Sequence, residues 1–408
     1  MDLGPIAQLV ERPAHNRLVP GSNPGGPTIL KMSLLIKDVV GKLENLIPLD
    51  LQEEWDNSGY QIKFSSTPVA GIITSLDLSK KSIDLALKTN FNLILIHHPL
   101  FFHPLRSLDF NSAAGKFIEI LIKNKICVYA MHTNFDSSGY SMSRYILHKL
   151  DTKEISPLIP GKRNLYKLSV FIPKGYVKTV RNALFKYGNP KIGNYENCSF
   201  ESKGKGSFKP LDDSNPFIGG AGKTSFVDES KVELLVEERF IGQAVEEMKK
   251  VHPYEEAAFD IYPLYDFGGA KEEGIGATGN FDGAIRLDNL LEKIQNTFSP
   301  IFINYCGRLN KKIKKIAVVS GSGFSFMKNA IKSGCDLLIS SELKHSDAIK
   351  AGSSGICLIE MSHFDTEKYF AAITKGIIEK EFNLNIAVAE NTGESNPFQK
   401  YKDKGGEF

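Results

Sequence analysis

The sequence predicts an α/β protein in which one discontinuous, mostly parallel sheet domain is interrupted by an α+β unit. Two observations predict the sheet domain: short apolar runs alternate with amphipathic segments over residues 32–163, and the same alternation returns over residues 267–408. A third observation predicts the insertion, because residues 164–266 follow a different strand and helix order that is rich in loops. At 408 residues the chain is long enough for two or three such units.

The first 31 residues differ in character from the rest of the chain. They are rich in Pro, Gly and Asn, lack sustained periodicity, and resemble peptides produced by translation across a transfer-RNA gene. This similarity favours Met32 as the biological start, with a disordered native tail as the alternative. We expect a chain that begins at Met32 to fold unchanged.

Residues 32–163 predict helices that alternate with buried strands. Val39, Val40, Leu43 and Leu46 recur at helical spacing and predict an amphipathic first helix. The strand segments are short continuous apolar runs, as in strands buried on both faces of a parallel sheet. In order, the expected elements are a helix from 33 or 37, a strand at 69–76, a helix at 80–89, a strand at 93–96, a helix at 113–123 and a strand at 126–131.

The inserted unit begins with a segment that alternates apolar and polar residues, as a half-buried strand does. A section rich in Gly, Asn and Ser at 188–224 then indicates hairpins and long loops. The expected elements are strands at 165–172, 231–236 and 257–264, with helices at 177–185 and 243–251.

The second half of the sheet domain follows a glycine-rich stretch at 268–279. Apolar runs and helical periodicity again alternate, and the last strand is expected to close the sheet. The expected elements are helices at 287–294, 326–333 and from 363 to about 381, and strands at 315–319, 335–339, 355–360 and 385–389.

Composition excludes several classes of function. An apolar fraction of 42% and a charged fraction of 24% are ordinary for a globular protein, and a net charge of +3 is too small to indicate a nucleic-acid or membrane partner. No apolar run approaches the roughly 18 residues of a membrane helix. The five cysteines are dispersed, which indicates reduced thiols in a cytoplasmic protein and no cysteine-based zinc site.

Two adjacent histidines, His97 and His98, follow the strand expected at 93–96. In open α/β sheets, ligands bind at the carboxyl ends of the strands. Neighbouring residues in extended chain point to opposite faces, and Pro99 keeps His98 extended. The pair is therefore poorly placed to bind one metal together but could serve two neighbouring metals.

Further imidazole and carboxylate side chains follow other predicted strands. His363 and Glu367 lie four residues apart and share one face of a helix start. Imidazoles and carboxylates without thiolates suit Zn²⁺, Mn²⁺ or Fe, and bridging carboxylates could hold two metals about 3.5–4 Å apart. The histidines at or just beyond strand ends are His97, His98, His103, His132, His345 and His363, and the carboxylates are Asp77, Asp136, Glu342 and Glu367.

Each of these signals also has a plain structural explanation. The pair His363 and Glu367 could be a solvated helix face, and His-His-Pro could be a turn that ends a strand. The turn at 320–323, Ser-Gly-Ser-Gly, could offer backbone N–H groups to a phosphate, or be an ordinary tight turn. The glycines at 274, 276 and 279 match a dinucleotide fingerprint, but no clear strand precedes them and no clear helix follows.

Several blocks of the sequence resemble the Nif-three-like family, whose members are called GTP cyclohydrolase I type 2 homologues. The resemblance runs from about Met32 to Phe398 and rests on the combination of blocks. These blocks are Trp55-Asp56-Asn57-Ser58-Gly59, His97-His98-Pro99-Leu100-Phe101-Phe102, His132-Thr133-Asn134-Phe135-Asp136, Ser341-Glu342-Leu343-Lys344-His345, His363-Phe364-Asp365-Thr366-Glu367 and Ser395-Asn396-Pro397-Phe398.

The resemblance implies a centre with two divalent metal ions per chain. Its ligand positions are His97, His98, Asp136, His363 and Glu367. His132 and Glu342 would lie beside the ligands and, together with His345, could move protons. Relatives often have a histidine pair where this chain has His345 followed by Ser346, which weakens that role for the block.

The resemblance also implies an architecture, an assembly and a function. The insert resembles a PII- or CutA-like domain, and the resemblance rests on the block Val251-His252-Pro253-Tyr254-Glu255-Glu256-Ala257. Longer bacterial members assemble as homohexamers, so a homohexamer is expected here too. His252 is therefore expected to be structural or interfacial. We expect a metal-dependent hydrolase that acts on a nucleotide or phosphoester, two metals polarising a substrate oxygen. The alternative is a non-enzymatic regulatory or metal-trafficking protein whose insert senses a small ligand.

Overall fold

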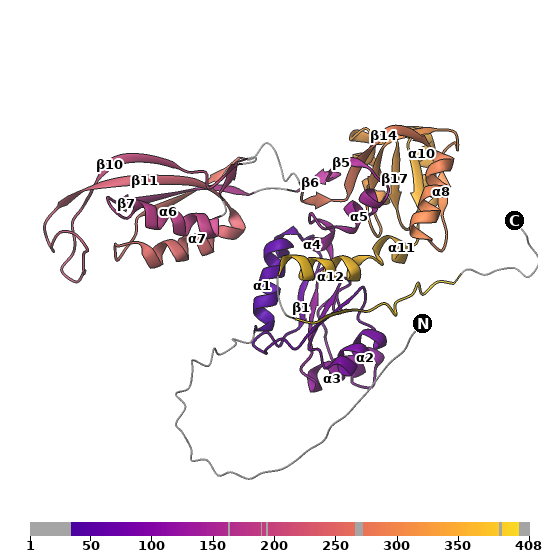
Figure 1. The fold of residues 1–408 in the computed structure, drawn as a ribbon, viewed down its shortest axis with the longest axis horizontal. Coiled ribbons are helices and arrows are strands. Elements are labelled where there is room, and N and C mark those ends of the chain that lie inside the picture. The colour runs from indigo at the N-terminus through magenta and orange to yellow at the C-terminus, as the bar shows by residue number, and fades with distance from the viewer. Residues whose placement is uncertain are drawn as a thin grey trace, which may run out of the picture.

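The computed structural model describes residues 34–161, 164–188, 190–192, 195–265, 272–382 and 386–399, and Figure 1 shows their arrangement. The extension at 1–31 and the proposed start at Met32 lie outside the described residues. Within the described part, no helix is both long and apolar enough to cross a membrane.

The first half of the chain forms a five-stranded sheet in the order β1-β4-β3-β2-β19. The pairs β19–β2, β2–β3 and β3–β4 are parallel, and β1 is antiparallel to β4. Three predicted elements have the expected bounds, because their apolar patterns are unbroken and their ends are marked: α2, β3 and α3. The elements are α1 (Ile36–Leu46), η1 (Leu49–Leu51), β1 (Gly59–Ile62), β2 (Ile72–Ser75), α2 (Lys80–Thr89), β3 (Leu93–Ile96), α3 (Ala113–Lys123), β4 (Cys127–Ala130), α4 (Thr133–Asp136) and α5 (Met142–Lys149).

The second half forms a separate six-stranded sheet in the order β15-β18-β17-β16-β14-β5. Only β16–β17 and β17–β18 are parallel pairs; β15, β14 and β5 join antiparallel. The elements are β13 (Gly274–Ile275), β14 (Ala277–Arg286), α8 (Leu287–Phe298), β15 (Asn304–Cys306), β16 (Lys312–Val318), η2 (Phe324–Phe326), α9 (Met327–Lys332), β17 (Leu337–Ser340), α10 (His345–Ser354), β18 (Cys357–Glu360), α11 (His363–Glu367), α12 (Phe370–Glu381) and β19 (Val388–Glu390).

The expected closure into one sheet is wrong, because the strands form two sheets, and the two halves of the chain exchange strands between them. The short strand β5 (Lys153–Ser156) leaves the first half and pairs with β14 in the second sheet. The last strand, β19, leaves the second half and pairs with β2. The helix expected from 363 to 381 is two helices, α11 and α12. The first, α11, borders the cluster of side chains described below. The second, α12, packs against β2 and β19, and its Phe370 is fully buried in the core beside Tyr129 and Phe135.

The glycine-rich stretch at 268–279 contains a strand that the sequence did not reveal. Its described residues form β13 and the start of β14, with Gly274 and Gly279 in these strands and Gly276 in the bend between them, so the three glycines do not form a strand-turn-helix nucleotide site. A Cβ at Gly279 would lie 2.5 Å from Oγ1 of Thr152. Glycine is needed at position 279 because Thr152 lies too close to β14 for a larger side chain.

Residues 165–264 form a unit with its own sheet and its own core. The sheet order is β10-β11-β7-β12, all antiparallel, and Figure 1 shows α6 and α7 on one face of it, apart from the other two sheets. The strand β10 lies where hairpins and loops were expected. The elements are β7 (Leu165–Pro173), α6 (Val177–Gly188), β10 (Phe200–Phe208), β11 (Ser225–Glu237), α7 (Glu238–Val251) and β12 (Phe259–Leu264), with short pairs β6 (Ile159–Pro160) with β13 and β8 (Lys191–Ile192) with β9 (Tyr195–Glu196).

Candidate metal centre

The five side chains in the predicted ligand positions come together between the two sheets. His97 and His98 directly follow β3, and Asp136 is the last residue of α4, just after β4. His363 and Glu367 are the first and last residues of α11, which follows β18 of the other sheet. Each half of the chain thus contributes its strand ends to one cluster.

Glu367 lies at the middle of this cluster and is almost completely buried. Its Oε2 is 3.0 Å from Nε2 of His98 and 3.1 Å from Nε2 of His363. Nε2 of His98, a ring nitrogen of His363 and a carboxylate oxygen of Glu367 all fall within 4.8 Å of one another, as do ring nitrogens of His97, His98 and His132. Both groups could hold a metal ion.

His97 supplies the clearest sign of a missing partner. The residue is fully buried, and its Nε2 has no hydrogen-bond partner. Oδ2 of Asp136 and Oε1 of Glu367 lie 3.7 Å and 3.9 Å away, beyond hydrogen-bond range. Buried ring nitrogens are normally satisfied, and two ligand atoms about 2.1 Å from one ion lie roughly 3.4 Å apart. The residues present therefore fit a divalent cation.

The other ring nitrogen of each histidine is held by an oxygen. Nδ1 of His97 is 2.8 Å from the carbonyl oxygen of Met131, and Nδ1 of His98 is 2.8 Å from Oδ1 of Asp77. Metal-binding histidines show this pattern, because the second partner fixes the tautomer and the ring orientation. It leaves Nε2 of both rings directed at the cluster.

His363 and His132 are held in the same way. Nδ1 of His363 lies 2.9 Å from Oε1 of Glu342, and Nδ1 of His132 lies 2.8 Å from Oδ1 of Asp56. The other oxygen of Asp56 accepts hydrogen bonds from the backbone N–H and the hydroxyl of Thr133. Glu342 and His132 therefore lie where the sequence analysis placed them, beside the ligand positions.

The electrostatics of the cluster match a site built for positive charge. Burial and the Glu367 carboxylate raise the pKa of Asp136, whereas hydrogen bonds from His363 and His98 hold the pKa of Glu367 well below its usual range despite burial. Burial lowers the pKa of His97 to about 3, so its ring is neutral.

His98 and His363 carry the compensating protons. Burial opposes the charge on His98, but hydrogen bonds with Asp77 and Glu367 raise its pKa to about 10. The hydrogen bond with Glu367 likewise raises the pKa of His363 to about 9. An entering metal ion would displace these protons, since imidazole must be neutral to ligate.

The turn after β16 closes the cluster from the side of the second sheet. Gly321 has φ +63°, and a Cβ there would lie 2.5 Å from Oε1 of Glu367 and 3.3 Å from Nε2 of His363. The hydroxyl of Ser320 donates to Oδ1 of Asp136 at 3.0 Å. The Ser-Gly-Ser-Gly turn, left open between a tight turn and a phosphate site, thus contacts the predicted ligands directly.

Two cavities reach the cluster, and both are lined by His363 and Glu367. The Trp55 cavity, of about 380 Å³, also contains His132, Asp136 and the turn at 320–322. The Phe398 cavity, of about 310 Å³, contains Asp77, His98, Glu342 and the segment at 396–398.

Two exposed aromatic rings stand at the mouth of the Trp55 cavity. Trp55 is 60% exposed and Phe102 is 44% exposed, and their rings stack with centroids 6.1 Å apart. Both rings meet the imidazole of His132 edge-on. An apolar platform therefore adjoins the candidate metal centre.

Two predicted candidates lie outside this arrangement. His345 is exposed as the first residue of α10, and His103 is exposed after β3; neither is among the residues that line the two cavities. A proton-transfer role for His345 stays a prediction. Sequence reasoning missed the contribution of Asp56, although its place next to Trp55 in a quoted block was the available signal.

The fold and the cluster define the class to which this protein belongs: two-sheet α/β proteins with a cluster of histidines and carboxylates at the joint between the sheets. The chain belongs to the Duf34/NIF3 (NGG1p interacting factor 3) family, whose sequence model matches residues 34–397. The predicted family resemblance is thereby confirmed.

Individual relatives cover nearly the whole chain. A GTP cyclohydrolase 1 type 2 homolog of Staphylococcus aureus (strain MSSA476) is 32% identical over 367 residues, which are 89% of this chain and 99% of the relative. A homolog of the same name from Halalkalibacterium halodurans is 35% identical over 343 residues, 84% of this chain and 91% of the relative. The crystal structure of a Bacillus cereus protein related to NIF3 superposes with a TM-score of 0.81 at 28% identity, covering 91% of this chain and all of that one.

Proposed function

We propose that this protein is a metal-dependent hydrolase that binds two divalent metal ions, Zn, Fe or Mn, and acts on a nucleotide or another phosphate-containing compound. The ligands in this proposal are His97, His98, Asp136, His363 and Glu367. The observation that carries it is the unpartnered, fully buried Nε2 of His97, which faces two carboxylates at distances too long for hydrogen bonds.

Two such ions would supply Lewis acidity to a substrate oxygen and lower the pKa of a nearby water. The protein supplies positioning and proton transfer. Asp56 holds Nδ1 of His132, which leaves the Nε2 of this ring to accept or give a proton in the Trp55 cavity. Asp77 and Glu342 orient the rings of His98 and His363.

The shape of the Trp55 cavity supports a substrate with a planar ring. Exposed aromatic side chains bind nucleobases by stacking, at about 1–3 kcal/mol per base. Residues 320–322 of the turn after β16 line the same cavity. A ring on Trp55 with a phosphate or ester directed at the cluster fits this arrangement.

We further propose the architecture and assembly that the family resemblance implied. Residues 32–163 and 267–408 would form the metal-binding domain and residues 164–266 a PII- or CutA-like insert, supported by the separate sheet and core of 165–264. Exposed apolar side chains on β10 and β11, such as Phe200 and Phe226, support a homo-oligomer, which we propose to be a hexamer in the cytoplasm. Light scattering coupled to size exclusion measures this assembly directly.

The test of the function has two parts. Elemental analysis of the purified protein should find close to two metal ions per chain, and His98→Ala and Glu367→Ala should each lose at least one. The metal-loaded protein is then assayed for turnover of a panel of nucleotides and phosphoesters. Full metal content in both variants would refute the ligand assignment. Bound metal that exchanges reversibly, without turnover of any compound, would refute the hydrolase and favour a regulatory or metal-trafficking protein.

A further inference from the structure

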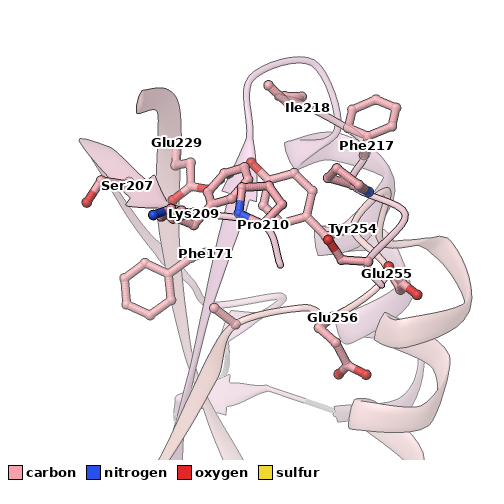
Figure 2. Close-up of a pocket in the computed structure, with 15 residues that line it drawn as sticks. Phe171, Ser207, Lys209, Pro210, Phe217, Ile218, Glu229, Tyr254, Glu255 and Glu256 are labelled. Carbon is pink, nitrogen blue, oxygen red and sulfur yellow. Dashed lines mark hydrogen bonds between the residues drawn. The ribbon is translucent and has the colours of Figure 1, made fainter. Parts of the chain in front are cut away.

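A second cavity lies in the unit formed by residues 165–264, far along the chain from the predicted ligands. It measures about 500 Å³ and is bordered by β7, the end of β10 and the loop that joins β10 to β11. Figure 2 shows its side chains, with Phe217 and Ile218 carried by this loop. Cavities of this volume with mostly apolar walls are typical of small-molecule sites.

Aromatic rings form the walls of this cavity. The ring of Tyr254 lies 6.0 Å from that of Phe208 and 6.3 Å from that of Phe217, and Phe171 adds a fourth ring. His252 fixes the segment that carries Tyr254: its Nε2 is 3.0 Å from the carbonyl oxygen of Phe171, and its Nδ1 accepts the backbone N–H of Tyr254. The buried His252 therefore has the structural role expected of it.

One carboxylate is built into this aromatic wall. Oε1 of Glu229 accepts a hydrogen bond from the hydroxyl of Tyr254 at 2.8 Å. Its Oε2 lies over the backbone of β10 at Gly206, where any Cβ would be only 2.1 Å away. The tyrosine holds the carboxylate and the glycine leaves room for it, so its position is a feature of the fold and not of a free surface side chain.

The charge around the cavity is negative. Glu229, Glu255 and Glu256 oppose the single Lys209 among the lining residues, three negative charges against one positive, a net charge of −2. Glu255 and Glu256 are exposed, whereas Glu229 is half-buried. A carboxylate in apolar surroundings is stabilised by a cation, and the faces of aromatic rings attract cations as well.

We propose that this cavity is a binding site for a small organic cation, with an apolar body packed against the rings of Tyr254, Phe208 and Phe217 and a positively charged nitrogen paired with Glu229. The site is independent of the metal centre. It would let the unit at 165–264 respond to an amine-containing metabolite.

The experiment compares three probes that share one ring and differ in charge: tryptamine, indole and indole-3-acetate. Calorimetric titration of the full chain should show tryptamine binding about tenfold or more tighter than indole, the range of a hydrogen bond to a charged group, with indole-3-acetate weakest. Glu229→Gln should remove the preference for tryptamine and leave indole binding within about threefold. The matched control, Glu246→Gln, removes an exposed carboxylate of the same unit that does not line the cavity, and should keep the preference.

A second variant tests the rings separately from the charge. Phe217 is 49% exposed, so Phe217→Ala should leave the fold intact, as circular dichroism can verify, while weakening all three probes alike. Equal affinity for the three probes, an unchanged preference in Glu229→Gln, or no binding of tryptamine at millimolar concentration would each overturn the proposal. The last result is also the one expected if a second copy of the chain covers the cavity.

Discussion

Replacing His97 with asparagine should separate a metal ligand from a structural histidine. Asparagine places its Nδ2 near the position of Nδ1, so it can still donate to the carbonyl oxygen of Met131, which Nδ1 of His97 approaches to 2.8 Å. The variant removes the buried Nε2 that has no partner, together with the far edge of the ring. In the metal-free protein, relief of that unsatisfied atom, about 1–3 kcal/mol, offsets the small cavity left by the ring.

The effect on the metal-loaded protein is much larger. A metal at 1,000 times its Kd stabilises the folded state by about 4.1 kcal/mol. If His97→Asn weakens binding about 100-fold, the same metal concentration is only about 10 times Kd, and the stabilisation falls to about 1.4 kcal/mol. The variant should therefore be nearly as stable as the natural sequence without metal and about 2.7 kcal/mol less stable with it.

Chelator competition measures the metal affinity, and urea unfolding with and without Zn²⁺ measures the stability. His252→Gln is the matched control, since His252 is also buried and glutamine can keep the contact of its Nε2 with Phe171. An His97→Asn protein that retains its metal affinity, or that is equally destabilised with and without metal, would refute the assignment of His97 as a ligand.

Three further predictions follow from contacts at the cluster. Because Gly321 has a positive φ, Gly321→Ala should lower the free energy of unfolding by about 1–2 kcal/mol. Elemental analysis of this variant should also find metal lost, since the new Cβ meets Glu367. The control is Gly355→Ala, at φ +76° in open space, which should lower the free energy of unfolding by about as much and keep its metal. Trp55 is the only tryptophan, so nucleotide binding should change the intrinsic fluorescence. Trp55→Leu should weaken nucleotide binding, measured by calorimetry, about 5- to 150-fold and leave the metal content unchanged. Unaltered affinity for the nucleotide would exclude the stacking role of Trp55. Burial raises the pKa of Asp56, but hydrogen bonds from His132 and Thr133 outweigh burial and hold this pKa below its ordinary value of 3.8. The ionised carboxyl therefore stabilises the fold above about pH 4, and this stabilisation is lost as the pH falls towards the lower pKa of the folded state. Urea unfolding of Asp56→Asn should therefore depend less steeply on pH between 4 and 2, and an unchanged slope would contradict the charge-assisted pairing.

The sequence predicted those elements whose local pattern is complete. The helix α2 and the strand β3 have the expected bounds, because capping by Ser79 and a continuous apolar run mark their limits. The strand β14 was missed because glycines that permit a close approach to Thr152 resemble a loop in sequence. The pairing of β19 with β2 was not predicted, since strand pairing depends on contacts that no local pattern records.

The site was predictable to the extent that strand ends meet in an α/β fold. Strand ends alone indicated six histidines and four carboxylates, and the family resemblance implied the five ligand positions His97, His98, Asp136, His363 and Glu367, which the structure brings together. A quoted block contained Asp56, but its contact with His132, like the approach of Gly321 to Glu367, joins segments that only the folded chain places together.

The exchange of β5 and β19 between the sheets has a consequence for the chain during its synthesis. Ile72 of β2 pairs with Val388 of β19, which the ribosome adds 316 residues later. At about 5–20 residues per second, the outer edge of β2 stays unpaired for roughly 16–60 seconds, and an open strand edge invites association with other chains. The nascent protein therefore passes through a period in which its first sheet is incomplete and α11, with His363 and Glu367, does not yet exist, so the cluster can assemble only after both halves of the chain have been made.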